Sequence, residues 1–337
     1  MPLANRMADA MRDTTQRHVL ISDQEYQLPY SKGLMASSIM ATGLPPARAF
    51  HVAEVVEERL HALGRETVSQ REVTDLTLEV LRSEVGDRYA ATFEKWQTVK
   101  SLDRPLVVLI GGATGVGKST IATMLASRLG ITRVIPTDAI REVMRSMFTE
   151  DLLPTLHASS FDSARMVRGP LPNDTDPLIV GFREQVAAVA VGVQALLTRA
   201  AEEGTGVIIE GAHVVPGFLD LTAVADKAVV VPLVISIDDE EVHLSHFVAR
   251  AADLTSSRPV TRYFDFFESI RRLHRYIRSM ALRHGVPVVP SYNLDATLSN
   301  VIDLVVQQAV QAAEPPSPPP PPAATEPPVG TTTKRGT

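Results

Sequence analysis

A glycine-rich segment that ends in lysine and serine stands directly after an apolar run. Residues 111–120 read GGATGVGKST, with the spacing G-x-x-x-x-G-K-S from Gly112 to Ser119. Glycines let the backbone wrap closely around phosphate groups, and the N–H groups that open the following helix form an anion site. Lys118 would reach the β- and γ-phosphates, and the Ser119 hydroxyl would be a ligand of Mg²⁺. The residues predicted to bind a nucleotide are Gly112, Ala113, Thr114, Gly115, Val116, Gly117, Lys118, Ser119 and Thr120.

An acid and an arginine follow the next apolar run. After RVIP the chain continues Thr137-Asp138-Ala139-Ile140-Arg141, which places Asp138 at the carboxyl end of a predicted parallel strand, where open α/β sheets hold their ligands. Asp138 could accept the proton of an acceptor hydroxyl or orient it, and Arg141 could hold an acceptor phosphate or carboxylate with two hydrogen bonds. The alternative is that Thr137 or Asp138 only caps the following helix.

A second acid, Glu210, ends the apolar run Val207 to Ile209, which gives the segment the form of a Walker B strand. Glu210 would hold Mg²⁺ through water, or would act as the base if Asp138 does not. A strand-end acid that simply faces water is the alternative. His213, three residues later, is either a substrate contact or a structural histidine.

Arginines recur in a polar break between two helical patterns, at Arg250, Arg258 and Arg262. In phosphoryl transfer, arginines on a lid neutralise the transferring group and exclude water. We expect Arg258 and Arg262 to act in this way, the alternative being ordinary surface arginines. A later basic run has helical spacing and is expected to be solvated or ion-paired, although one member could point into the acceptor site; it comprises Arg271, Arg272, Arg275 and Arg278.

The elements that must position these residues alternate between short apolar runs and longer helical patterns. Strands are predicted at 106–110, 133–136, 207–209, 228–237 and 286–289, and helices at 119–129, 139–147, 178–201, 239–252, 264–284 and 296–313. Such alternation predicts an α/β fold of the P-loop NTPase type, with a parallel sheet and helices on both faces. Apolar runs without alternation are typical of strands buried on both sides.

The first hundred residues have a different pattern and predict a small, mostly helical domain. An extended piece at 17–30 is followed by helices at 50–63 and 73–81, and 91–101 is a further helix or a connector. A break at Asp103-Arg104-Pro105 places the domain boundary near 98–104. The predicted division is a disordered N-terminus at 1–16, a leading domain at 17–98, a P-loop domain at 104–313 and a disordered proline-rich tail at 314–337.

Composition excludes several classes of protein. The chain has 337 residues and no cysteine, so disulfide frameworks and thiolate metal sites are excluded. A membrane-spanning helix needs about 20 apolar residues, and the most apolar run, 228–237, is half as long. The start of the chain has no apolar core of a signal peptide, so a cytoplasmic protein without a membrane partner is expected. A net charge of −6 argues against nucleic acid as a partner.

Four segments in this order resemble the 2-phosphoglycerate kinase family: GGATGVGKST, PTDAIREVMR, VIIEGAHVVPG and RYFDFFESIRRLHRYI. The N-terminal LPYSKGLM is similar to a segment of that family's ATP-cone-like leading domain, and the matches together cover about residues 17 to 310. ATP-cone domains usually carry an Asp-Gly turn, whereas this chain has Asp23-Gln24-Glu25. Only Lys32 is a candidate nucleotide contact in the leading domain, and it could equally be a surface lysine.

The resemblance implies transfer of the ATP γ-phosphate to 2-phosphoglycerate, giving 2,3-bisphosphoglycerate, with Mg²⁺ present. The residues expected to act are Lys118, Asp138, Arg141, Glu210, Arg258 and Arg262, with Ser119 and Glu210 at the metal. The pair Asp138 and Arg141 also resembles zeta-toxin-like and other small-molecule P-loop kinases, so a nucleotide or sugar acceptor is an alternative. A non-catalytic ATP sensor is a second alternative. The sequence leaves the oligomeric state open.

Overall fold

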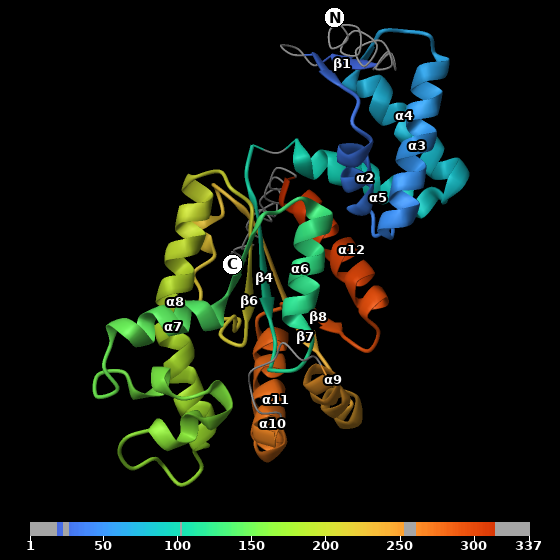
Figure 1. Cartoon of the computed structure of the whole chain (residues 1–337). Helices are drawn as coiled ribbons and strands as arrows, with labels where there is room; N and C mark the ends of the chain where they lie inside the picture. The colour runs from blue at the N-terminus through green and yellow to red at the C-terminus, as the bar shows by residue number, and fades with distance from the viewer. Residues whose placement is uncertain (1–18, 23–26, 102, 253–260, 314–337) are drawn as a thin grey trace, which may run out of the picture.

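The chain forms two units, each with its own sheet and helices (Figure 1). The structure is a computed structural model that describes residues 19–22, 27–101, 103–252 and 261–313. The ends that were predicted to be disordered, 1–16 and 314–337, lie outside the described residues, and so does Arg258.

The leading unit is mostly helical, as predicted, and it also contains a small sheet in the order β2-β1-β3. The strands are β1 (Leu20–Ser22), β2 (Gln27–Pro29) and β3 (Thr67–Ser69), and the helices are α2 (Lys32–Met40), α3 (Pro46–Ala62), α4 (Gln70–Glu84) and α5 (Asp87–Lys100). The predicted helices at 50–63, 73–81 and 91–101 are therefore confirmed as α3, α4 and α5. Helix α4 begins earlier than its apolar pattern because Ser69 and Glu72 form a capping box.

The larger unit is an all-parallel sheet in the order β5-β6-β4-β7-β8. Its strands are β4 (Leu106–Gly111), β5 (Arg133–Pro136), β6 (Val207–Gly211), β7 (Val229–Ser236) and β8 (Val288–Pro290). Its α-helices are α6 (Lys118–Leu129), α7 (Thr137–Met147), α8 (Pro177–Glu202), α9 (Glu240–Ala252), α10 (Thr261–Asp265), α11 (Phe267–Arg283) and α12 (Leu294–Ala313). Short 3₁₀ helices are η1 (Pro154–His157), η2 (Ser160–Met166) and η3 (Thr222–Val224).

Both faces of this sheet are covered by helices, as the sequence predicted. Val108 and Ile110 of β4 pack into the cluster that includes α6, α11 and α12, whereas Val107 and Leu109 pack into the cluster built around α8. Successive side chains of a strand point to opposite faces, so every residue of β4 is buried. The strand order brings the carboxyl ends of β5, β6 and β4 together at one edge.

The single helix predicted at 264–284 is two helices in the structure, α10 and α11. The chain breaks at Phe266, between α10 and α11, where the ring packs 5.4 Å from that of Phe161 in η2. The apolar spacing continues through the break, so the sequence pattern does not reveal it.

The two units pack against each other at the end of α6 that lies away from the phosphate loop (Figure 1). Arg128, near the end of α6, donates from Nη1 to the Leu44 carbonyl at 2.9 Å. Arg88 of α5 pairs with Asp303 of α12 at 2.6 Å. Trp96 of α5 is buried in the core of the larger unit. Helix α5 therefore contributes to the core of the larger unit. The domain boundary at 98–104 stays a prediction.

One described helix, α8, is long and apolar enough to span a membrane by length and composition alone. Its residues Val189, Val193 and Leu197 are fully buried against the sheet. This is the packing of a core helix, and a core helix can be as long and as apolar as a membrane-spanning one. The expectations of no membrane partner and of a cytoplasmic location stay predictions.

Candidate active site

The glycine-rich segment forms the connection between β4 and α6, the predicted context for a phosphate loop. Gly112, Gly115 and Gly117 all have positive φ, at 143°, 89° and 88°, a backbone region that glycine enters without strain. Lys118 opens α6 and is 8% exposed, and its Nζ donates to the Ala113 carbonyl at 2.7 Å. The lysine therefore folds back over the loop.

The predicted Walker residues meet in the structure. Ser119 Oγ, at the start of α6, donates to Glu210 Oε1 at 2.8 Å. Parallel pairing of β4 with β6 sets Ile110 opposite Glu210, which explains the approach. Glu210 is 5% exposed, so the alternative of a strand-end acid in water does not hold.

Asp138 lies on the first turn of α7 and Arg141 about one turn later, and α7 follows β5, the strand next to β6. Pro136 of β5 pairs with Glu210 of β6. Asp138, two residues after Pro136, therefore lies just beyond Glu210 in the direction of the strands. The N-cap of α7 is Pro136, without a side-chain cap bond, so the capping alternative for Thr137 or Asp138 is not what the structure shows. The Asp138 side chain is exposed, and its Oδ1 lies 3.7 Å from Arg141 Nε.

Arg141 is a buried anchor for the segment that follows α7. Its Nη1 donates to the Leu156 carbonyl at 2.9 Å and to the Ala158 carbonyl at 3.0 Å. Its Nε is buried and has no hydrogen-bond partner among the described residues. One edge of the guanidinium therefore holds η1, while the Nε edge lies beside Asp138.

His213 is structural in this arrangement. Its Nδ1 lies 3.0 Å from Thr137 Oγ1 and its Nε2 lies 3.0 Å from Gln185 Oε1. The Gln185 amide nitrogen donates to the Thr155 carbonyl, so the amide oxygen must accept from His213 Nε2–H. Burial lowers the pKa of His213 to about 4, with Asp138 opposing the shift. The neutral His213 ring therefore holds Thr137, the residue that precedes Asp138, in place.

Gly211 makes that contact sterically possible. A Cβ on Gly211, whose φ is +153°, would lie 1.8 Å from Thr137 Oγ1. Glycine at this position therefore makes room for the Thr137 side chain. Sequence reasoning missed Gln185, although a polar residue inside the apolar stripe of 178–201 was a visible signal.

The predicted lid arginines are only partly described. Arg262 of α10 lies 3.5 Å from Asp162 and stacks over the Phe161 ring at 5.7 Å, so it contacts η2 and not the phosphate loop. Arg258 and the side chain of Arg250 lie outside the part of the chain that the structure describes.

The four arginines of the later basic run are ion-paired, which was one of the two outcomes that the sequence predicted. Arg271 pairs with Glu240, Arg272 with Asp176, Arg275 with Glu268 and Arg278 with Asp238.

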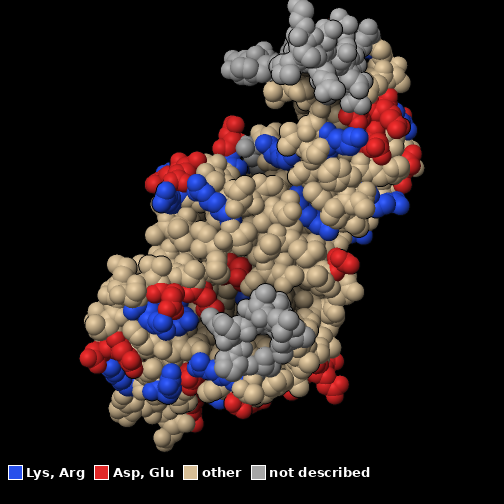
Figure 2. All heavy atoms as spheres, viewed as in Figure 1, with Lys and Arg blue, Asp and Glu red and all other residues tan. Residues whose placement is uncertain are grey.

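Lys32 in the leading unit also has acidic partners. Its Nζ lies 3.4 Å from Glu54 and 3.0 Å from Glu57, and contact with these carboxylates raises its pKa, the Glu57 hydrogen bond being the main cause. Two carboxylates beside the ammonium oppose binding of a phosphate there. On the face shown in Figure 2, basic and acidic side chains occur in small mixed groups.

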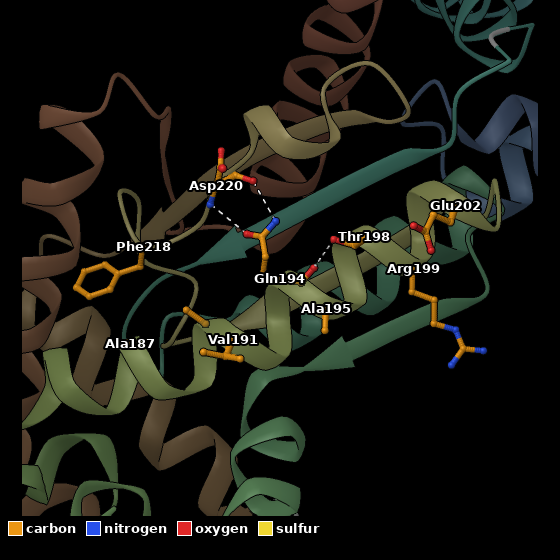
Figure 3. Close-up of a pocket in the computed structure, with 10 residues that line it drawn as sticks. Ala187, Val191, Gln194, Ala195, Thr198, Arg199, Glu202, Phe218 and Asp220 are labelled. Carbon is orange, nitrogen blue, oxygen red and sulfur yellow. Dashed lines mark hydrogen bonds between the residues drawn. The ribbon is translucent and has the colours of Figure 1, made fainter.

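A hollow of about 660 Å³ lies on the outer side of α8 (Figure 3), and none of the residues that line it belongs to the phosphate loop. Its lining includes Val191, Arg199 and Phe218, and Gln194 bridges to Asp220 across it. This half of α8 leads into the start of β6, whereas the phosphate loop lies where β4 ends. The hollow therefore takes no part in the site.

Comparison with known proteins identifies relatives over most of the chain, although no family model matches it. The 2-phosphoglycerate kinase of Methanothermobacter thermautotrophicus is 37% identical over 294 residues, which are 87% of this chain and 95% of that protein. The one of Methanopyrus kandleri is 37% identical over 297 residues, with 88% and 90% covered. The one of Thermococcus kodakarensis is 38% identical over 281 residues, with 83% and 94% covered.

A solved shikimate kinase from Bacteroides thetaiotaomicron is 16% identical, with 59% of this chain and 98% of its own covered and a TM-score of 0.33. The sequence relatives carry the assignment, since they extend through both units. With more than a third of its residues identical to these proteins along nearly their full length, the chain belongs to the 2-phosphoglycerate kinase family.

Proposed function

We propose that this protein transfers the γ-phosphoryl group of ATP to the free C3 hydroxyl of 2-phosphoglycerate. The O3–Pγ bond forms, the bond from Pγ to the β-γ bridging oxygen breaks, and the products are 2,3-bisphosphoglycerate and ADP. The observation that carries the proposal is the contact of Ser119 with Glu210 beside Asp138, at one edge of a parallel sheet. Membership of the family supplies the acceptor.

The phosphate loop supplies the ATP site. Backbone N–H groups between Gly112 and Thr120 bind the phosphates, and the start of α6 adds its dipole. Lys118 exchanges the Ala113 carbonyl for phosphate oxygens. These interactions neutralise charge that develops during transfer, and positioning with electrostatic stabilisation is the main source of catalysis in phosphoryl transfer.

Ser119 and Glu210 fit the position of a magnesium ion. Neighbouring ligands in an octahedral Mg²⁺ shell lie about 3 Å apart, close to the 2.8 Å between Ser119 Oγ and Glu210 Oε1. The described residues hold no group of three or more His, Cys, Asp or Glu side chains suited to a metal. Mg²⁺ usually keeps waters and phosphate oxygens as its other ligands, so two protein oxygens suffice; when bound, the ion screens phosphate charge.

Asp138 is the proposed base. Its carboxylate is exposed at the sheet edge, whereas Glu210 is buried and engaged with Ser119. Asp138 therefore takes the proton of the acceptor hydroxyl, and Glu210 serves the metal. The Arg141 Nε–H, which has no hydrogen-bond partner among the described residues, binds an oxygen of the acceptor.

Arg262 and Arg258 are proposed to close over the transferring group. Arg262 is half-exposed and is held at η2 by a long, 3.5 Å contact with Asp162, which also pairs with Arg165 at 3.0 Å; an ion pair of this kind contributes about 0–1 kcal/mol. Exchange of Asp162 for a phosphate oxygen therefore costs little. The position of Arg258 in the sequence next to α10 supports the same role.

The test is ADP release by the purified full chain with ATP and Mg²⁺, offered 2-phosphoglycerate, 3-phosphoglycerate or a panel of nucleoside monophosphates. We expect 2-phosphoglycerate alone to raise ADP release well above the rate with water, with stoichiometric 2,3-bisphosphoglycerate. Lys118→Ala should abolish the response, and Lys227→Ala, a lysine in the loop before β7, should not. If another acceptor raised ADP release instead, that compound would take the place of 2-phosphoglycerate as the proposed substrate. ATP binding without ADP release for any acceptor would favour the sensor alternative.

A further inference from the structure

Helix α9 lies against the phosphate loop and presents two histidines to its backbone. His243 Nε2 lies 2.8 Å from the Thr114 carbonyl oxygen, and His246 Nδ1 lies 3.0 Å from the Gly115 carbonyl oxygen. The two histidines are three residues apart, a spacing that puts side chains on one face of a helix. Two consecutive peptide groups of the loop are therefore held by one face of α9.

The direction of these hydrogen bonds follows from the chemistry of their partners. A carbonyl oxygen only accepts, so each imidazole nitrogen must carry the proton. For His243 the other ring nitrogen is fixed as well. Arg271 Nη1 lies 3.3 Å from His243 Nδ1, and because a guanidinium only donates, that nitrogen must be the acceptor.

Arg271 is itself held in place. It is 5% exposed, and it donates to the Ile237 carbonyl at 2.7 Å and to the Asp238 carbonyl at 2.6 Å, where β7 leads into α9. Burial lowers the pKa of His243 to about 4, and the Arg271 charge adds to this shift. The ring is therefore neutral near pH 7, as the donor and acceptor roles require.

Holding a carbonyl also fixes the N–H on the other side of the same peptide plane. The chain has no cis peptide bond among its described residues, and in a trans peptide C=O and N–H point in opposite directions. The peptide that carries the Thr114 carbonyl carries the N–H of Gly115, and the next carries the N–H of Val116. Both N–H groups consequently point away from α9.

Packing fixes the distance between α9 and the loop. A Cβ on Gly115 would meet Phe247 Cζ at 2.3 Å, so the Phe247 ring lies directly against this glycine. That ring stacks on His243, with centroids 5.4 Å apart, and on Tyr263 of α10, with centroids 5.0 Å apart. The donors thus stand on a rigid aromatic support.

We propose that His243 and His246 are positioning residues of the nucleotide site, which by donating to the Thr114 and Gly115 carbonyls hold the Gly115 and Val116 N–H groups toward the nucleotide phosphates. This inference rests on the proposed ATP site. The two histidines touch neither substrate directly. They lower the cost of ordering the loop when phosphates bind, which is preorganisation of an anion site.

His246 gives the sharper test because two substitutions separate its donor from its shape. Asparagine keeps an N–H donor near the Nδ1 position, whereas leucine has similar branching and no donor. The measurement is the Kd of Mg·ADP by titration calorimetry on the full chain, with KM values for ATP and 2-phosphoglycerate. His246→Leu should weaken ADP binding and raise KM for ATP about two- to tenfold, the effect of one net hydrogen bond. His246→Asn should stay within about twofold of the parent protein.

His51→Leu on exposed α3 is the matched control and should change neither constant. Thermal midpoints identify a variant that is merely unfolded, and His243→Gln, which keeps a donor near Nε2, gives a second donor-retaining variant. KM for 2-phosphoglycerate should be unchanged in every case.

If His246→Leu and His246→Asn bind ADP equally well, or lose affinity equally, the positioning role is wrong. Failure of the parent protein to bind Mg·ADP would instead contradict the proposed function.

Discussion

Ser119 Oγ donates a hydrogen bond to Glu210 Oε1 across 91 positions of sequence. The contact joins the helix after the phosphate loop to the end of β6. It exists because β6 inserts between β5 and β4 in the sheet. The two oxygens therefore meet at the carboxyl edge of the sheet, where the loop also lies.

Replacement of Glu210 tests the metal site that this contact suggests. Glu210→Gln keeps the size of the side chain and an oxygen that accepts from Ser119, but it removes the charge that attracts Mg²⁺. We expect kcat to fall about 100-fold or more and the Mg²⁺ concentration for half-maximal rate to rise. Steady-state rates over a Mg²⁺ series measure both, with Glu241→Gln on α9 as an exposed control. An unchanged Mg²⁺ requirement would contradict a metal role for Glu210.

Replacement of Asp138 separates a base from a nucleotide ligand. Asp138→Asn preserves shape and removes the proton acceptor, so turnover should fall about 100- to 10,000-fold while the Kd of Mg·ADP stays nearly unchanged. Asp151→Asn, at a fully exposed carboxylate, is the control. Parallel loss of ADP affinity would make Asp138 part of the nucleotide site.

Buried histidines make stability depend on pH. Burial is the main cause that lowers the pKa of each of three histidines to about 4: His213, His243 and His274. Because the unfolded chain binds these protons near pH 6.5 and the folded protein does not until about pH 4, stability is full above pH 6.5 and is lost as pH falls toward 4. Each histidine should lower the free energy of unfolding by about 1.4 kcal/mol per pH unit in that window.

Urea unfolding at pH 7 and pH 5, followed by fluorescence of the single tryptophan, Trp96, measures this loss. Trp96 is buried where α5 meets the larger unit, so its emission reports on that packing. His274→Gln should reduce the difference between the two pH values, and His51→Gln on the surface should leave it unchanged. Equal stability of the parent protein at both pH values would show that these histidines do not titrate as stated.

The sequence by itself determined the phosphate loop, the α/β alternation and the acids at two strand ends. These features are local: glycine spacing, apolar period and the residue after a strand are all written in short windows. The strands at 106–110 and 207–209 and the helix at 178–201 accordingly agree with the structure within a residue or two at each end.

What only the tertiary structure decided depends on which segments become neighbours. Strand order set Glu210 against Ser119, and a buried hydrogen-bond chain made His213 a support for Thr137. The Arg271 guanidinium, expected to be solvated or ion-paired, also donates hydrogen bonds to the Ile237 carbonyl and to His243. Donor direction, burial and approach distance arise when distant segments pack together, and for that reason no spacing in the sequence showed that α9 holds the phosphate loop.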